Sequence, residues 1–401
     1  MDISHDILSD RYGMDVMRSY KFRVYPSNKQ INLIEQHFNA CRIVYNLGME
    51  ARLYAYSSQK IYLNSYNLNK QLPELKKENP WLYEINAQSL QDVFKSQDSA
   101  FTNFYKHGAD FPKFRSKRRW RPSFKCPQGN KLLINERKLR IKKFPEGIKI
   151  IIDRIPKGEL RNVVISKSPT GKYYASLTYE TNENLLDKKP INDNAAIGID
   201  LGLTHFATLS NGEKIANPKF LKENLQRIKV LQRRLSKKQK GSNRYKLYQH
   251  KINILYEKIK NQRMDFLHKL SNQITNDYDT ICIENLNIKG MMKNHSLAGA
   301  IADVSWYEFI RQLTYKSRWK GKNILIIGQF EPSSKLCTCG VINKNLKLSD
   351  REWKCSSCGV HHDRDILAAN NIKRIAILNN SGRVSPGVDV ELPTLVGAMK
   401  R

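Results

Sequence analysis

The 401-residue sequence lacks any apolar run long enough to cross a bilayer, and no segment resembles a secretory signal peptide. Acidic side chains are also scarce, because 37 Asp and Glu residues stand against 69 Lys and Arg. The first deficit argues against a membrane partner and leads us to expect a cytoplasmic protein. The second leaves a formal net charge of +32, which attracts polyanions, so nucleic acid is the expected partner.

Cysteine is nearly as scarce, with seven in the chain, but four of them lie close together: Cys337, Cys339, Cys355 and Cys358. One tight cluster in a cytosolic chain is typical of a zinc site rather than of disulfides. Four thiolates leave no open position on the metal, so we expect one structural Zn²⁺. His361 or His362 is an alternative ligand.

The distribution of residue types predicts an α+β multidomain fold. Ser19–Ser27 alternates like a strand, residues 131–180 are β-rich, and residues 181–193 are polar and turn-forming. We expect a leader over 1–16 and a flexible tail over 381–401. Between them, a wedge-like N-terminal β-barrel domain covers 17–190 and contains a helical insertion at about 30–125. A C-terminal α/β domain covers 191–380 and contains a zinc knuckle at about 331–361.

Apolar residues recur at helical spacing in several segments, and Pro73 and Pro80 are expected to break one of them. The expected helices cover 29–57, 66–106 with its two breaks, 218–238, 242–276, 305–321, and a segment that starts near Asp365.

Two buried strands each carry one acid among apolar residues. Because side chains alternate, the isoleucines of IGIDLG face one side of the sheet, and Gly198 and Asp200 face the other. In ICIENL, the isoleucines again face one way, and Cys282 and Glu284 the other. An unpaired carboxylate beside buried apolar residues is costly, so we expect a cation near both acids.

A third acid opens the last expected helix. Asp365 shares a helical face with the residues that follow it at matching spacing, Ala368, Ala369, Ile372 and Ala376. This apolar face is expected to pack on the sheet, so Asp365 would point toward the two strands. Asp363 lies outside this face and is interpreted as a helix cap or a partner of Arg364; it is the competing candidate.

Three converging carboxylates offer hard oxygen ligands suited to Mg²⁺ or Mn²⁺. Two such ions can activate water and stabilise the leaving oxygen at a phosphodiester. We therefore predict that Asp200, Glu284 and Asp365 are the catalytic residues and magnesium ligands of a nuclease.

The order of strand Asp, strand Glu and helix Asp resembles that of the RuvC-like branch of the RNase H fold. Other segments resemble successive motifs of the TnpB family, compact nucleases encoded by bacterial insertion sequences and similar to miniature type V CRISPR effectors. The segments are KFRVYPSNKQ, CRIVYNLGMEAR, FPKFRSK, GIDLGLTHFATLSNG, ICIENLNIKGM, WYEFIRQLTYKSRWKG and KCSSCGVHHDRDILAANNI. In that family the three matching acids are the catalytic metal ligands.

The resemblance implies an RNA-guided DNA endonuclease of an insertion sequence, with a RuvC-like C-terminal domain. Its partners would be a guide RNA derived from the transposon end and a double-stranded target DNA. The DNA would be cut beside a short element-adjacent motif. The particle would be a monomeric ribonucleoprotein in the bacterial cytoplasm, at the nucleoid.

The sequence departs from the family pattern at two places. Cys337 and Cys339 are separated by one residue, where the family usually has Cys-x-x-Cys. Leu367 stands two residues after Asp365, where the family commonly has Asn. The first departure implies weaker zinc binding, and the second puts full activity in question.

Two basic regions are the candidate nucleic-acid contacts. The loop Lys113–Lys125 mixes cations with aromatic rings, which suits phosphates and stacked bases, although a solvated basic loop is the alternative. The helices over 218–276 are expected to line a channel for the heteroduplex, with a solvated helical face as the alternative. The candidates are Lys113, Arg115, Lys117, Arg118, Arg119, Trp120, Arg121, Arg233, Arg234 and Lys237.

Three other functions stay open. An RNA-guided DNA-binding protein with weak or no cleavage would act as a repressor, and a miniature type V CRISPR effector would share these motifs. A transposase that joins strands itself is less favoured, because the sequence has no evident tyrosine-recombinase or His-hydrophobe-His signature.

Overall fold

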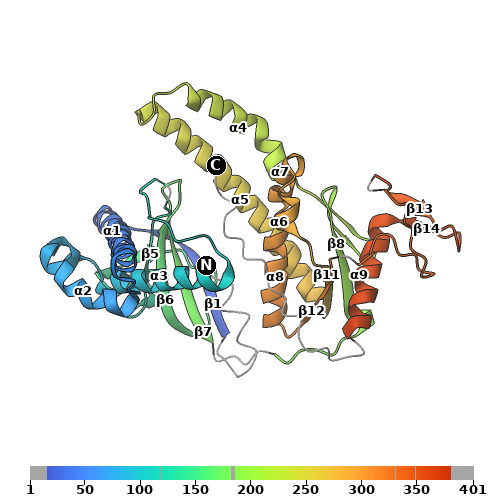
Figure 1. Ribbon diagram of the computed structural model, residues 1–401, viewed down its shortest axis with the longest axis horizontal. Coiled ribbons are helices and arrows are strands. Elements are labelled where there is room, and N and C mark those ends of the chain that lie inside the picture. Colours follow the sequence, from blue (N-terminus) through green and yellow to red (C-terminus); the bar gives the residue numbers. More distant parts are fainter. Residues whose placement is uncertain (1–15, 119, 182–185, 330, 348, 381–401) are drawn as a thin grey trace. The chain divides into compact units, whose positions relative to one another are not determined.

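The computed structural model describes residues 16–380 except 119, 182–185, 330 and 348 (Figure 1). The described residues up to 181 lie in one compact unit, and those from 186 onward lie in a second. No helix among the described residues is long and apolar enough to cross a membrane.

The first unit is built on one antiparallel sheet of seven strands in the order β2-β6-β7-β1-β5-β4-β3. The long strand β1 is central because it pairs with β7 on one side and β5 on the other. The strands are β1 (Val16–Tyr25), β2 (Ser123–Cys126), β3 (Lys131–Leu133), β4 (Lys138–Ile141), β5 (Phe144–Ile150), β6 (Glu159–Lys167) and β7 (Tyr173–Thr181). Among the described strands no ladder joins β2 to β3, so closure into a barrel stays a prediction.

Helices lie between β1 and β2 in the chain: α1 (Asn28–Gln59), α2 (Ser65–Glu78), the short 3₁₀ helix η1 (Pro80–Glu84) and α3 (Ala87–His107). A capping box starts α1, because Ser27 and Gln30 exchange side chain–backbone hydrogen bonds. The expected break at Pro73 is wrong: this proline lies inside α2. Burial of Leu68 and Leu72 on the same helix offsets the lost backbone hydrogen bond.

The second unit contains a mixed sheet in the order β10-β9-β8-β11-β12. Its strands are β8 (Ala196–Leu201), β9 (His205–Leu209), β10 (Lys214–Ala216), β11 (Thr280–Glu284) and β12 (Asn323–Ile327). The three strands β8, β11 and β12 are parallel, whereas β9 and β10 run antiparallel to their neighbours. Helices cover both faces of this sheet, which confirms a mixed α/β fold (Figure 1).

The helices of this unit are α4 (Phe220–Ser236), α5 (Asn243–Asp277), α6 (Ile288–Met291), α7 (His295–Val304), α8 (Trp306–Trp319) and α9 (Arg364–Asn380). The long helices α4 and α5 pack along each other through Ile228, Leu255 and Ile259 (Figure 1). The sequence patterns located α4, α5, α8 and α9 but missed α6 and α7. A short hairpin of β13 (Glu352–Lys354) and β14 (His361–Asp363) leads directly into α9.

Candidate active site and zinc centre

Asp200 and Glu284 lie at the carboxyl ends of neighbouring parallel strands. The register pairs Ile199 of β8 with Ile283 of β11, and each acid is the next residue along its strand. In open α/β sheets the carboxyl ends of parallel strands form the usual crevice for ligands. The two acids therefore occupy matching positions at a place suited to chemistry.

The alternation expected for the two strands is confirmed. The isoleucines of both strands belong to one core with α5 and α8, whereas Cys282 packs with Ile372 and Ala376 of α9 on the opposite face. Gly198 allows α9 to come this close. A methyl group there would overlap the carbonyl oxygen of Ala369 and lie 2.9 Å from the Lys373 side chain. The face that carries the acids is thus the face covered by α9.

Asp365 lies in the first turn of α9, and Asp363 caps that helix. One carboxylate oxygen of Asp363 accepts hydrogen bonds from the backbone N–H groups of Asp365 and Ile366, both at 3.1 Å. Its other oxygen pairs with Lys214 Nζ of β10 at 2.6 Å. The interpretation of Asp363 as a cap is confirmed, and the side chain of Asp365 is left for other contacts, with Arg351 Nη1 at 3.7 Å from its Oδ1.

The electrostatics distinguish these acids. Burial, followed by the negative charges of Asp365 and Glu284, raises the pKa of Asp200 from its ordinary 3.8 to about 7. Burial also raises the pKa of Glu284. The pKa of Asp363 is lowered: burial opposes this shift, but hydrogen bonds from Lys214 and two backbone amides outweigh it. The charge of Arg364 lowers the pKa of Asp200, but burial and repulsion from the other two carboxylates outweigh it, so the three acids share one region in which negative charge dominates.

The donor chemistry of the three acids fits a hard divalent cation, because carboxylate oxygens are the ligands that Mg²⁺ and Mn²⁺ prefer. Their spacing is looser than that of a closed site. Among the described residues, only the four cysteines bring three or more ligand atoms within 4.8 Å of one another. The three acids therefore do not form a closed cluster of that kind.

The cysteines form the tighter centre. All four sulfurs lie within 4.8 Å of one another, with Cys337 Sγ at 3.5 Å from Cys358 Sγ and Cys339 Sγ at 3.7 Å from Cys355 Sγ. Tetrahedral zinc with bonds of about 2.3 Å sets its sulfurs about 3.8 Å apart. Burial opposes ionisation of Cys337, but hydrogen bonds from the Cys339 backbone and the His362 ring lower its pKa to about 5. The cluster matches a four-thiolate zinc site despite the shortened Cys-x-Cys pair.

The second departure from the family pattern, Leu367, has a structural role. Leu367 is buried in a small core with Leu346, Trp353 and two of the cysteines. Asn371, one turn later on α9, donates from Nδ2 to the carbonyls of Ser333 and Leu336, both at 2.7 Å. The helix that carries Asp365 is thus fixed to the cysteine segment by one apolar and one polar contact.

The basic loop between α3 and β2 carries one group of the predicted nucleic-acid contacts. Lys117, Arg118 and Arg121 are exposed, and Lys113 pairs only loosely with Asp110 at 3.7 Å. Arg115 is half-buried and places its guanidinium 3.7 Å from the centre of the Tyr45 ring, which makes it partly a packing residue. Trp120 is half-buried against the core of the first unit. Arg119 lies outside the described residues.

The second group lies at the end of α4. Arg233 and Arg234 occupy the last turn of the helix, and Lys237 follows it; all three are exposed. They stand on the α4–α5 pair, whose core is small. This exposed position suits contacts with a long polyanion.

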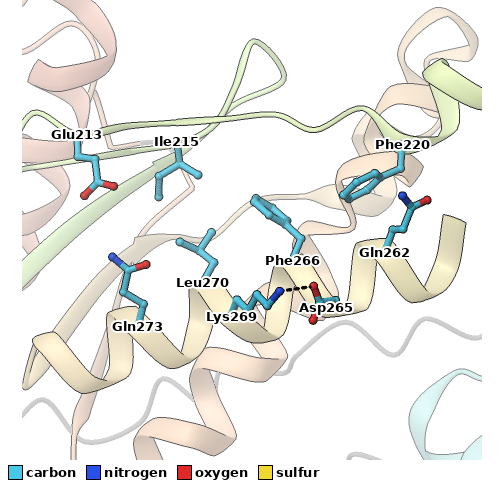
Figure 2. A pocket seen from close by; sticks show the side chains of 9 residues that line it. All are labelled: Glu213, Ile215, Phe220, Gln262, Asp265, Phe266, Lys269, Leu270 and Gln273. Carbon is cyan, nitrogen blue, oxygen red and sulfur yellow. Dashed lines mark ion pairs between the residues drawn. The ribbon is translucent and has the colours of Figure 1, made fainter. Parts of the chain in front are cut away.

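A cavity of about 500 Å³ lies between α5 and the segment that carries Glu213 and Ile215 (Figure 2). Phe220, Phe266 and Leu270 contribute its apolar lining, and an ion pair of 2.7 Å between Lys269 and Asp265 lies along α5. The residues that line it include none of the three candidate acids.

Sequence reasoning missed the two cations near the acids. Lys214 meets Asp363 across 149 positions of sequence, and Arg351 reaches Asp365 from the segment before β13. Arg351 also donates to the Thr204 hydroxyl at 3.2 Å. No local pattern marks such pairs, because only the packing of the sheet, the cysteine segment and α9 brings them together.

Comparison with protein families gives three matches. Residues 176–295 match a family of insertion-sequence proteins, OrfB of IS605, described as "Probable transposase". Residues 306–372 match the "Cas12f1-like, TNB domain", and residues 14–60 match a "Helix-turn-helix domain". In the described part of that last range, the fold is the strand β1 followed by the single helix α1.

Two bacterial relatives cover most of the chain. A Streptomyces pristinaespiralis protein is 35% identical over 362 residues, which are 89% of each chain; its name gives it, provisionally, as an RNA-guided DNA endonuclease. InsQ of Escherichia coli K12, named in the same way, is 29% identical over 90% of this chain and 92% of its own. A solved Cas12f1–sgRNA–target DNA complex is more distant, with a TM-score of 0.49 and 14% identity over 90% of this chain and 99% of that chain.

Proposed function

Because the chain belongs to the TnpB family of insertion-sequence proteins, we propose that it is an RNA-guided DNA endonuclease. The relative that carries this argument is similar over 89% of this chain and 89% of its own length, so the proposal is not confined to one segment. The guide RNA would come from the transposon end and would select a double-stranded target beside a short adjacent motif. The working particle would hold one protein chain.

The reaction is hydrolysis of a DNA phosphodiester at Asp200, Glu284 and Asp365. Two Mg²⁺ or Mn²⁺ ions held by these acids would supply an activated water and stabilise the leaving oxygen. The observation that carries this assignment is the placement of Asp200 and Glu284 at matching ends of neighbouring parallel strands, where burial and the charges of Asp365, in the first turn of α9, and of Glu284 raise the pKa of Asp200. Such repulsion is costly unless cations relieve it, and strongly shifted groups cluster at functional sites.

The other residues of the site act on the acids. Asp363 accepts hydrogen bonds from two backbone amides in the first turn of α9, and this cap would hold Asp365 in position beside the strands. Gly198 keeps α9 close to β8, because no larger residue fits under Ala369. One zinc ion on the four thiolates would stabilise the segment that Leu367 and Asn371 attach to the same helix.

The N-terminal unit and the α4–α5 pair are proposed to hold the nucleic acids. The domain over 17–190, with its sheet wrapped as a wedge-like barrel, would grip RNA and target DNA, and the RuvC-like domain over 191–380 would cut. Support comes from the charge of +32 and from exposed cations on both regions, such as Lys117, Arg118, Arg233 and Arg234. Contacts of this kind with the nucleic-acid backbone recognise the A-form shape of the duplex rather than its base sequence.

The test begins with expression of the protein together with the DNA that flanks its gene. The purified particle is analysed for RNA and then incubated with Mg²⁺ and plasmids that carry the matching target beside randomised flanks. We expect one discrete RNA and linearisation that depends on both target and flank. Absence of RNA would contradict the guided function. Tight target binding without cutting, when all three acids are intact, would favour the repressor.

A further inference from the structure

One histidine of the cysteine segment is buried and touches a predicted zinc ligand. His362 lies on β14 opposite Trp353 of β13, is 7% exposed, and packs against the indole with ring centres 4.8 Å apart. Its Nε2 lies 3.0 Å from Cys337 Sγ. The adjacent His361 is exposed and faces Glu352 at 3.7 Å. Only one of the two neighbouring histidines is therefore directed at the metal site.

The direction of the hydrogen bond follows from the chemistry of sulfur. A zinc-bound cysteine is a thiolate, which can accept hydrogen bonds but has no proton to donate. The imidazole must then carry its proton on Nε2 and donate it to Cys337 Sγ. Cys337 is fully buried, so solvent cannot supply this bond in place of His362.

The position of the ring distinguishes a donor from a ligand. The four sulfurs each lie within 4.8 Å of all the others, and the Nε2 atom of His362 is not a member of that set. Among the four sulfurs, the hydrogen bond of the ring goes to that of Cys337, and the ring packs against Trp353. A zinc ion at the centre of the four sulfurs would have its coordination filled without the imidazole.

We propose that His362 is a positioning residue that donates an Nε2–H hydrogen bond to the Cys337 thiolate and so strengthens zinc binding. Four thiolates around one Zn²⁺ carry excess negative charge, and hydrogen-bond donors outside the metal shell stabilise it. The shortened Cys337–Cys339 pair lacks the usual two-residue turn, so this half of the site is expected to bind zinc more weakly. The hydrogen bond from His362 of β14 to Cys337 compensates for that weakness. This inference rests on the zinc centre of the proposed function.

The main experiment measures zinc affinity of the full-length chain by competition with a chromophoric chelator. His362→Phe keeps a ring against Trp353 but removes the donor, whereas His362→Gln keeps an N–H donor at the same reach. We expect zinc affinity to fall roughly 10-fold or more in His362→Phe and to recover most of that loss in His362→Gln. His361→Phe, next to it on the exposed side, is the matched control and should leave affinity unchanged.

Substitution of Co²⁺ for zinc tests whether His362 is itself a metal ligand, which zinc affinity alone does not show. The visible bands of Co²⁺ bound to four thiolates should keep their positions in His362→Phe, because the ligands stay the same. A shift of these bands would show that His362 is a ligand and would overturn the proposal, as would unchanged zinc affinity in His362→Phe. If the unmodified chain binds no zinc, the zinc centre and this inference both fail. If it binds zinc and His362→Phe has no effect, only this inference fails.

Discussion

The two candidate metal sites of the second unit both involve helix α9, which carries Asp365 and packs Leu367 against two of the cysteines, but they are organised in opposite ways. The four thiols lie within 4.8 Å of one another, as in a site already shaped for its ion. The carboxylates of Asp200, Glu284 and Asp365 are more open and repel one another. A structural metal needs a closed shell, whereas a catalytic metal needs room for substrate and water. In the proposed function, the cysteine site supports the fold and the carboxylate site performs the chemistry.

The carboxylates should show the largest effect on activity. Asp200→Asn or Glu284→Gln removes a metal ligand and is expected to lower cleavage by roughly 10³-fold, about 4 kcal/mol of transition-state stabilisation, with RNA content unchanged. The measurement is the rate of plasmid linearisation by particles of equal RNA content. Asp265→Asn is the control, because that exposed acid forms an ion pair with Lys269 of its own helix, and this variant should cut normally. Cleavage by Asp200→Asn near the normal rate would remove the catalytic assignment.

Gly198 should show the next largest effect, on stability. Gly198→Ala places a methyl group against the Ala369 carbonyl and forces α9 away from β8, which we expect to cost about 1–3 kcal/mol. Thermal or denaturant unfolding measures the change, and cleavage should fall with it because Asp365 moves with α9. Gly299→Ala in α7 meets no atom within 4 Å and should be neutral or stabilising. Equal effects at both glycines would argue against close packing of α9.

The open site should also depend on pH. The folded state holds a proton on Asp200 up to about pH 7, whereas the unfolded chain releases it near 3.8. The metal-free protein therefore loses stability as pH rises between these values, because its folded state binds more protons there. Mg²⁺ competes with that proton, so it should raise Tm more at about pH 8 than at about pH 5.5. An equal Mg²⁺ effect at both pH values, or the same pH dependence in Asp200→Asn, would contradict this account.

The smallest effect is expected at Lys214, which supports the cap of α9 from β10. Both side chains of its pair with Asp363 are about 30% exposed, at 31% and 30%, so the pair is worth about 0.2–1 kcal/mol. Lys214→Met should lower stability by no more than this and slow cleavage only a few-fold. Lys269→Met, which breaks the exposed pair with Asp265, serves as the comparison. A loss at Lys214 as large as that of a carboxylate would place it in the reaction itself.

Strand alternation and helical spacing were sufficient to predict which face of the sheet carries Asp200 and Glu284 and that α9 covers it. They also separated Asp363 as a cap from Asp365. They could not reveal Arg351 beside Asp365 or the burial of Leu367 with the cysteines, because these contacts join distant segments. The continuation of α2 through Pro73 was missed for a related reason: tertiary packing outweighed a local rule.

Leu367 and the Cys337–Cys339 pair were the two features that favoured a protein without cleavage. Leu367 fills the core between α9 and the cysteines, and the four sulfurs gather despite the shortened spacing. Both departures are therefore accommodated within the second unit, and neither removes a carboxylate from the open site.

The most direct test of the account compares two aspartates that are two residues apart. Particles that carry Asp365→Asn or Asp363→Asn, with equal guide RNA, are incubated with Mg²⁺ and a plasmid that bears the target and its flank. We predict that Asp365→Asn binds the target but does not cut it. Asp363→Asn keeps a capping side chain and loses only the charge pair with Lys214, worth about 0.2–1 kcal/mol, so it still cuts at a slightly reduced rate. Normal cutting by Asp365→Asn with loss of cutting in Asp363→Asn would contradict the assignment of the site.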